Sequence, residues 1–113
     1  MKLNLLWKDK DNNIYKLGIL YKENNIFKFD IYENNLKSAI KRGCFGIGNF
    51  NFLKMHNESK ELFDFFKERI PNKDDPFINN LFLENKLKQY DEMELLKITK
   101  GELLYDRYFL EEI

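Results

Sequence analysis

Few side chains of this sequence could bind a metal ion or act as a nucleophile. His56 is the only histidine and Cys44 the only cysteine. A zinc site needs three or four ligands, and these two residues supply at most two soft ones. A histidine that acts as a general base needs an oriented partner, and the sequence identifies none for His56. We therefore expect His56 on the surface or in a turn, and Cys44 as a partly buried free thiol.

A glycine-rich segment runs from Gly43 to Gly48 and reads Gly-Cys-Phe-Gly-Ile-Gly. A phosphate-binding loop leads into the N-terminus of a helix, often with a Lys and a Ser or Thr placed for phosphate or magnesium. Here the glycines follow a predicted helix and lead into an aromatic run, without that pair. We expect a structural loop.

The carboxylates fall on predicted helix faces and in the C-terminal tail. Glu61, Asp64 and Glu68 fit a solvated helix face with lysines nearby. Asp74 and Asp75 could bind a metal ion, but helix capping already explains Asp75. No general acid–base pair stands out, so we predict no enzyme activity, no metal site and no cofactor.

Composition limits the classes of protein and of partner. A chain of 113 residues, 43% hydrophobic and 34% charged, fits one soluble domain spanning residues 1–113. Lysine plus arginine equals aspartate plus glutamate, at 19 each, so the net charge is zero. Proteins that bind nucleic acids usually carry a basic surplus. We therefore predict no direct contact with nucleic acid.

Cysteine usage and hydropathy suggest a compartment. A single cysteine excludes an internal disulfide and favours a reducing environment. No signal-peptide pattern is recognised at the N-terminus, and no apolar run approaches the ~20 residues that span a bilayer. We expect a cytoplasmic protein without a membrane partner.

Three strands are predicted in the N-terminal half. Residues 2–8 alternate between apolar and polar side chains, as in a strand, and residues 14–21 form a second strand. The third strand, residues 26–31, follows a short turn of asparagines that tolerate positive φ. Gly18 suggests a bulge or a close packing contact within the second strand. One face of that strand is expected to carry its larger side chains, namely Tyr15, Leu17, Ile19 and Tyr21.

Helices are predicted mainly in the C-terminal half. A short helix over 36–42 ends at Gly43, and a longer one over 60–70 is capped by Ser59 and stopped by Pro71. Another helix starts after Asp75 and runs to about residue 88.

The chain's last helix opens with a capping box of Asp91 and Glu94, and Gly101 ends it. Residues 103–113 fit either a returning strand or a loose tail. Because strands precede helices, the expected fold is α+β. In this fold the N-terminal half forms an antiparallel meander, which packs against three to four helices from the C-terminal half.

Aromatic residues give the sequence its strongest candidate binding surface. Phe63, Phe65 and Phe66 cannot all face one core from a single amphipathic helix. Phe65 and Phe66 fit the core, whereas Phe63 fits either the core or a partner interface. Arginine and aromatic residues are favoured at interface hot spots. The predicted partner-binding residues are Phe50, Phe52, Phe63 and Arg69.

Four segments, taken together, resemble the N-terminal domain of HipA-type toxin kinases. They are residues 15–20, with a hydrophobic-Gly-x-Leu centre, residues 27–30, the helix end over 62–71, and residues 91–96 followed by Lys100 and Gly101. The resemblance covers roughly residues 14–101. Glu68 stands where the family usually has Asn, Lys100 replaces the first glycine of a pair, and the segment from Gly48 to Leu53 is degenerate.

This resemblance implies a partner role. In split systems the small protein binds a separate HipA-type serine/threonine kinase as its antitoxin or regulatory subunit, with a DNA-binding antitoxin encoded beside it. No catalytic-loop Asp, metal-binding Asp or nucleotide-binding Lys is recognisable in a kinase setting, so the chain is not expected to be a kinase itself.

Two other functions stay open. The first is a phage-encoded or immunity-type protein that blocks an unrelated host enzyme. The second is a small enzyme with an unrecognised site, which a deep pocket with convergent carboxylates or a perturbed His56 would support.

Overall fold

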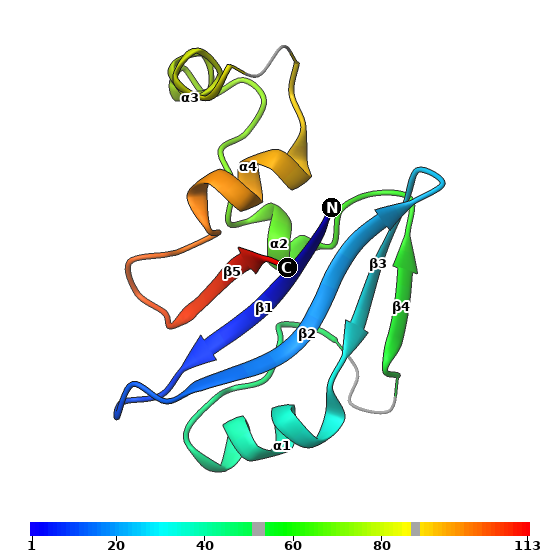
Figure 1. Cartoon of the computed structure of the whole chain (residues 1–113), viewed down its shortest axis with the longest axis vertical. Helices are drawn as coiled ribbons and strands as arrows, with labels where there is room; N and C mark the ends of the chain where they lie inside the picture. The colour runs from blue at the N-terminus through cyan, green and yellow to red at the C-terminus, as the bar shows by residue number, and fades with distance from the viewer. Residues whose placement is uncertain (51–53, 87–88) are drawn as a thin grey trace.

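Five strands form one antiparallel sheet in the structure, a computed structural model that describes residues 1–50, 54–86 and 89–113. The strands are β1 (Lys2–Lys8), β2 (Ile14–Glu23), β3 (Ile26–Ile31), β4 (His56–Ser59) and β5 (Tyr108–Glu112), in the order β4-β3-β2-β1-β5. Figure 1 shows β4 at one edge and β5 at the other. The predicted α+β fold with an antiparallel sheet is confirmed. Of the two possibilities for the C-terminal segment, the returning strand is the one formed.

The hairpin between β2 and β3 has a two-residue turn made by Asn24 and Asn25. Their φ values are +51° and +62°, and Glu23 pairs with Ile26 across the turn. Positive φ at both central residues is typical of a type I′ turn, whose twist matches that of the flanking strands. The sequence expectation for these asparagines is confirmed.

A bulge in β2 changes which side chains reach the core. Leu5 of β1 pairs with Gly18 but Leu6 pairs with Lys16, so Leu17 is an extra residue on β2. Leu17 is fully buried, whereas Ile19 pairs with Asn4 and lies on the opposite face. The predicted single face was therefore wrong, because a bulge breaks the two-residue period.

Gly18 is also a close packing position, as the sequence suggested. A Cβ atom there would lie 2.5 Å from the carbonyl oxygen of Asp30 and 2.8 Å from the ring of Phe29. Only a residue without a side chain fits between β3 and this part of β2.

The helices are α1 (Glu33–Lys41), α2 (Asp64–Lys67), α3 (Phe77–Asn85) and α4 (Glu92–Thr99). Asp75 accepts a hydrogen bond from the Phe77 N–H at 2.9 Å, and Asp91 accepts one from the Glu94 N–H at 3.2 Å. Both predicted helix starts are therefore confirmed. In α3, Lys86 adopts φ +57° just beyond Asn85, so the helix ends before residue 88.

The long helix predicted over 60–70 is wrong, since only the four residues of α2 are helical. Ser59 is the last residue of β4 and pairs with Phe27, so it does not cap a helix. Phe63 is extended, with ψ 142°, and precedes α2 directly. Strand pairing and the burial of Leu62 outweigh the local helical pattern.

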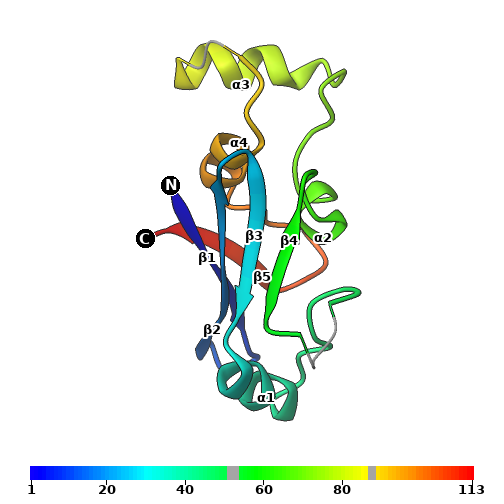
Figure 2. The same cartoon turned by 90° about the vertical axis from the view of Figure 1, so that its right-hand side faces the viewer.

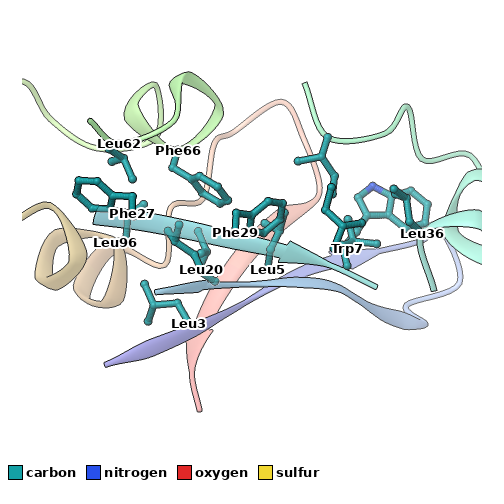
Figure 3. Close-up of a cluster of buried hydrophobic side chains, with 14 of the residues drawn as sticks. Leu3, Leu5, Trp7, Leu20, Phe27, Phe29, Leu36, Leu62, Phe66 and Leu96 are labelled. Atoms are coloured by element: carbon teal, nitrogen blue, oxygen red, sulfur yellow. The ribbon is translucent and has the colours of Figure 1, made fainter. Parts of the chain in front are cut away.

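One face of the sheet carries the core. Side chains from β1, β2 and β3 meet Leu62, Phe66 and Leu96 at one end, and Trp7 meets Leu36 at the other (Figure 3). Figure 2 shows α3 beyond α4, apart from the sheet. Of the residues of α3, only Ile78 is buried. The other face of the sheet carries mixed polar and apolar residues.

Candidate functional site

A groove of about 510 Å³ lies between β4 and α2. It contains two of the predicted partner-binding residues, Phe50 and Phe63, whose ring centroids are 5.2 Å apart. Its described lining comes from three segments: Gly48, Asn49 and Phe50; Asn57 and Ser59; and Glu61, Leu62, Phe63, Asp64, Phe65 and Glu68. The structure thus brings together residues that are distant in the sequence.

An aromatic cluster supports two of the residues that line the groove. Phe29 of β3 and Phe66 of α2 are fully buried, with ring centroids 5.1 Å apart. Phe50 packs on Phe29 at 4.9 Å, and Phe63 lies 6.4 Å from Phe66. Aromatic pairs at such distances contribute about 0.5–1.5 kcal/mol beyond the area that they bury. The cluster therefore holds Phe50 and Phe63, which are only partly buried, in fixed positions at the groove.

The rim of the groove is acidic. Glu61, Asp64 and Glu68 are exposed, and none of the described lining residues is Lys, Arg or His. The nearest paired cation is Lys67, whose Nζ lies 3.9 Å from Glu61 Oε2 in an exposed ion pair that is worth little. Apolar rings flanked by exposed carboxylates suit an apolar ligand that also carries a positive charge.

Arg69 lies inside the protein and not in the groove. Its Nη1 donates to the carbonyl oxygen of Gly101 at 3.0 Å, and its Nη2 lies 2.6 Å from Asp106 Oδ2. The guanidinium also stacks 4.3 Å from the ring centroid of Phe65. These contacts join α2 to the segment before β5. The position of Arg69 gives no support to the predicted partner contact.

The other predicted partner-binding positions differ in status. Phe50 and Phe63 lie at the groove, and their role as partner contacts stays a prediction. Phe52 lies outside the described residues.

His56 has the oriented partner that the sequence did not reveal. Its Nδ1 lies 2.9 Å from Asp30 Oδ1, and the hydroxyl of Tyr21 donates to Asp30 Oδ2 at 3.1 Å. Desolvation, followed by the bond to Asp30, raises the pKa of Tyr21. The His56 side chain is 84% exposed, which matches the expected surface position. The contact depends on β3 pairing with β4, a strand that the sequence did not predict.

Asp9 is a fully buried carboxylate in the turn between β1 and β2. Its oxygens accept hydrogen bonds from the backbone N–H groups of Asp11 and Asn13, and Arg42 Nε lies at 3.3 Å. Burial raises its pKa, but the bonds from Asn13, Asp11 and Arg42 outweigh that effect and lower the pKa to about 2. A carboxylate this well satisfied organises the turn and is a poor proton donor.

Cys44 is a buried free thiol, and its neighbours belong to contacts that hold a loop in place. Its Sγ lies 3.5 Å from the hydroxyl of Tyr108, which donates to the carbonyl oxygen of Gly46. Burial, followed by the interaction with Cys44, raises the pKa of Tyr108. The glycine-rich segment is thus fastened to β5, in agreement with the expected structural loop.

Large apolar side chains are also exposed outside the groove. On α3, Phe77 is 69% and Leu83 is 79% exposed. Phe45, Leu104 and Tyr105 are also exposed, in the loops after α1 and before β5. Exposed apolar groups in such numbers often mark interaction surfaces.

Within residues 1–50, 54–86 and 89–113, no three His, Cys, Asp or Glu side chains are grouped to hold a metal ion. Among the helices of those residues, none has both the length and the apolar character needed to span a membrane.

Comparisons of this chain with protein-family models, with curated proteins and with solved structures found no match. The resemblance to HipA N-terminal domains therefore depends on the sequence segments quoted above, and it stays a prediction.

Proposed function

We propose that this chain is a non-catalytic protein-binding module. In this proposal it binds a separate HipA-type serine/threonine kinase in the cytoplasm and regulates it, as antitoxin or regulatory subunit. The observation that carries the binding role is the groove between β4 and α2, where Phe50 and Phe63 pack on the buried rings of Phe29 and Phe66. The choice of a kinase as partner is supported by the sequence resemblance alone.

The groove has the properties of a preorganised binding surface. Its rings are fixed by packing, so little side-chain entropy remains to be lost when a partner binds. Apolar groups at the centre and carboxylates at the rim follow the usual arrangement of an interface core and its polar surround. Phe63 is central because it contacts both Phe50 and the buried Phe66.

Inhibition of the kinase requires no catalytic group on this chain. A bound module can exclude substrate from the active site, or hold the kinase in a conformation in which its catalytic residues are misplaced. The shift in the kinase equilibrium is limited by how much more tightly the module binds the inactive state.

The test is co-expression with a HipA-type kinase that lacks this domain and is encoded beside the chain. We expect the two proteins to co-purify and the kinase to lose activity in the complex. Phe63→Asp should weaken the complex, whereas Ile14→Asp, a matched change at an exposed position outside the groove, should not. Failure of the kinase to co-purify with the unaltered chain would contradict the proposal.

A further inference from the structure

Among the residues that the structure describes, β4 forms one edge of the sheet, directly beside the groove. β4 is the terminal strand in the order β4-β3-β2-β1-β5, and Figure 1 shows it along the outer edge of the sheet. Asn57 and Ser59 of β4 also line the groove. An edge strand offers unpaired backbone groups to another extended chain.

The register shows which backbone groups are free to pair. Ile31 N–H donates to the carbonyl oxygen of Met55 at 2.8 Å, and the same register pairs Phe29 with Asn57. Residues of an antiparallel pair alternate between bonding to the neighbour and facing away from it. The N–H and C=O groups of His56 and Glu58 therefore face outward from the sheet.

We propose that the groove and the β4 edge together bind an extended segment of a partner protein that carries apolar and basic side chains on one and the same face. The segment adds to β4 as a sixth strand, bonding to the backbone of His56 and Glu58. Its apolar side chains enter the groove at Phe50 and Phe63, and its Lys or Arg side chains reach Asp64 and Glu68.

Charge and geometry each contribute to this choice of occupant. The described groove lining contains three carboxylates and no cation, so an acidic segment would be repelled. Backbone pairing with β4 selects an extended segment over a helix, because a helix has already satisfied its own N–H and C=O groups. Because successive side chains of a strand point to opposite faces, the side chains that enter the groove come from every second residue of the segment.

This inference rests on the proposed binding role and names what the groove takes. It can be tested without the kinase, by selecting phage-displayed random dodecapeptides on the full chain. We expect enrichment of peptides in which every second residue is either apolar or a Lys or Arg. Asp64→Lys combined with Glu68→Lys should weaken the binding of a selected synthetic peptide about tenfold or more. Two changes at exposed carboxylates outside the groove, Glu84→Lys and Glu33→Lys, should leave its affinity unchanged.

Hydrogen exchange locates the bound peptide. On binding, the amide hydrogens of His56 and Glu58 should become protected, whereas those of Asn57 and Ser59 are already paired with β3. A peptide N-methylated at alternate residues should lose its binding. These two readouts separate strand addition from adhesion to the exposed apolar surfaces elsewhere.

Several outcomes would overturn the inference. They are no enrichment, enrichment of acidic or helical peptides, protection at a place other than β4, and a concentration-dependent dimer that occupies this edge. A kinase that binds while the library gives no such peptides would overturn the inference alone. Selected peptides that bind β4, together with a kinase that does not, would overturn the proposed function alone.

Discussion

Arg69 and Asp106 form an ion pair inside the protein, with Nη2 2.6 Å from Oδ2 and side chains that are 4% and 19% exposed. The two residues are 37 positions apart, and Arg69 also donates to Gly101. The pair therefore fastens the end of the α2 segment to the chain that leads into β5.

Removing the cation should destabilise the fold strongly. Arg69→Met leaves the Asp106 carboxylate without its charged partner, and we expect a loss of about 3 kcal/mol in the free energy of unfolding. Urea denaturation measures the loss. The control is Lys97→Met, which breaks an exposed pair with Glu112 at 3.4 Å and should cost less than about 1 kcal/mol. Equal losses in the two variants would show that Arg69 is not an interior residue.

Gly18 should not tolerate a methyl group. In Gly18→Ala the new Cβ would meet the Asp30 carbonyl at 2.5 Å, and backbone cannot move aside as cheaply as a flexible side chain. We expect a loss of about 2–3 kcal/mol in thermal or urea unfolding. Gly43→Ala is the matched control, because nothing lies within 4 Å of its Cβ position. It should cost only about 1 kcal/mol, for its positive φ.

Asp9 should make the free energy of unfolding decrease as the pH is lowered below about 4. Its pKa is lowered from the ordinary 3.8 to about 2 in the folded state. A lowered pKa means that the folded state favours the charged form, so the contribution is present above pH 4 and is lost as the pH falls toward 2. Asp9→Asn should therefore be less stable at neutral pH and should lose less stability between pH 4 and 2. Urea unfolding at a series of pH values measures both effects, and parallel curves for the two proteins would contradict the assignment.

The strands could be predicted more completely than the site. β1 and β3 matched their expected bounds because alternation and the asparagine turn are local signals. β4 was missed because its residues, His56 to Ser59, carry little apolar pattern and are ordered by pairing with β3. The groove depends on that pairing, so its existence could not be read from local sequence.

Arg69 shows the same limit for a single side chain. Its type and its place beside aromatic residues fit an interface, but its charge is satisfied by Asp106, far along the sequence. Only the path of the chain back to β5 reveals that contact. Phe63 was easier to single out, because the sequence shows that one amphipathic helix could not turn Phe63, Phe65 and Phe66 toward the same core.

Truncation of Phe63 should destabilise the fold less than truncation of Phe66. Phe66 is fully buried, so Phe66→Ala should lose about 3–5 kcal/mol through lost burial and the cavity left behind. Phe63 is half-buried at the groove, so Phe63→Ala should lose about 1–2 kcal/mol and leave the fold intact for binding experiments. Chemical denaturation of the two variants gives the comparison. A loss at Phe63 as large as that at Phe66 would assign Phe63 to the core alone.

Mutations in helix α3 should change the stability of the protein only on the side of the helix that is buried. Ile78 is its buried residue, so Ile78→Ala should lose about 2 kcal/mol if unfolding is cooperative. Phe77 and Leu83 are 69% and 79% exposed, so Phe77→Ser and Leu83→Ser should each change the free energy of unfolding by less than about 0.5 kcal/mol. Urea denaturation with circular dichroism measures all three variants at one protein concentration. If the losses at Phe77 or Leu83 were larger than this and shrank when the measurement was repeated at lower protein concentration, these side chains would be covered by a second molecule, because a dimer dissociates on dilution.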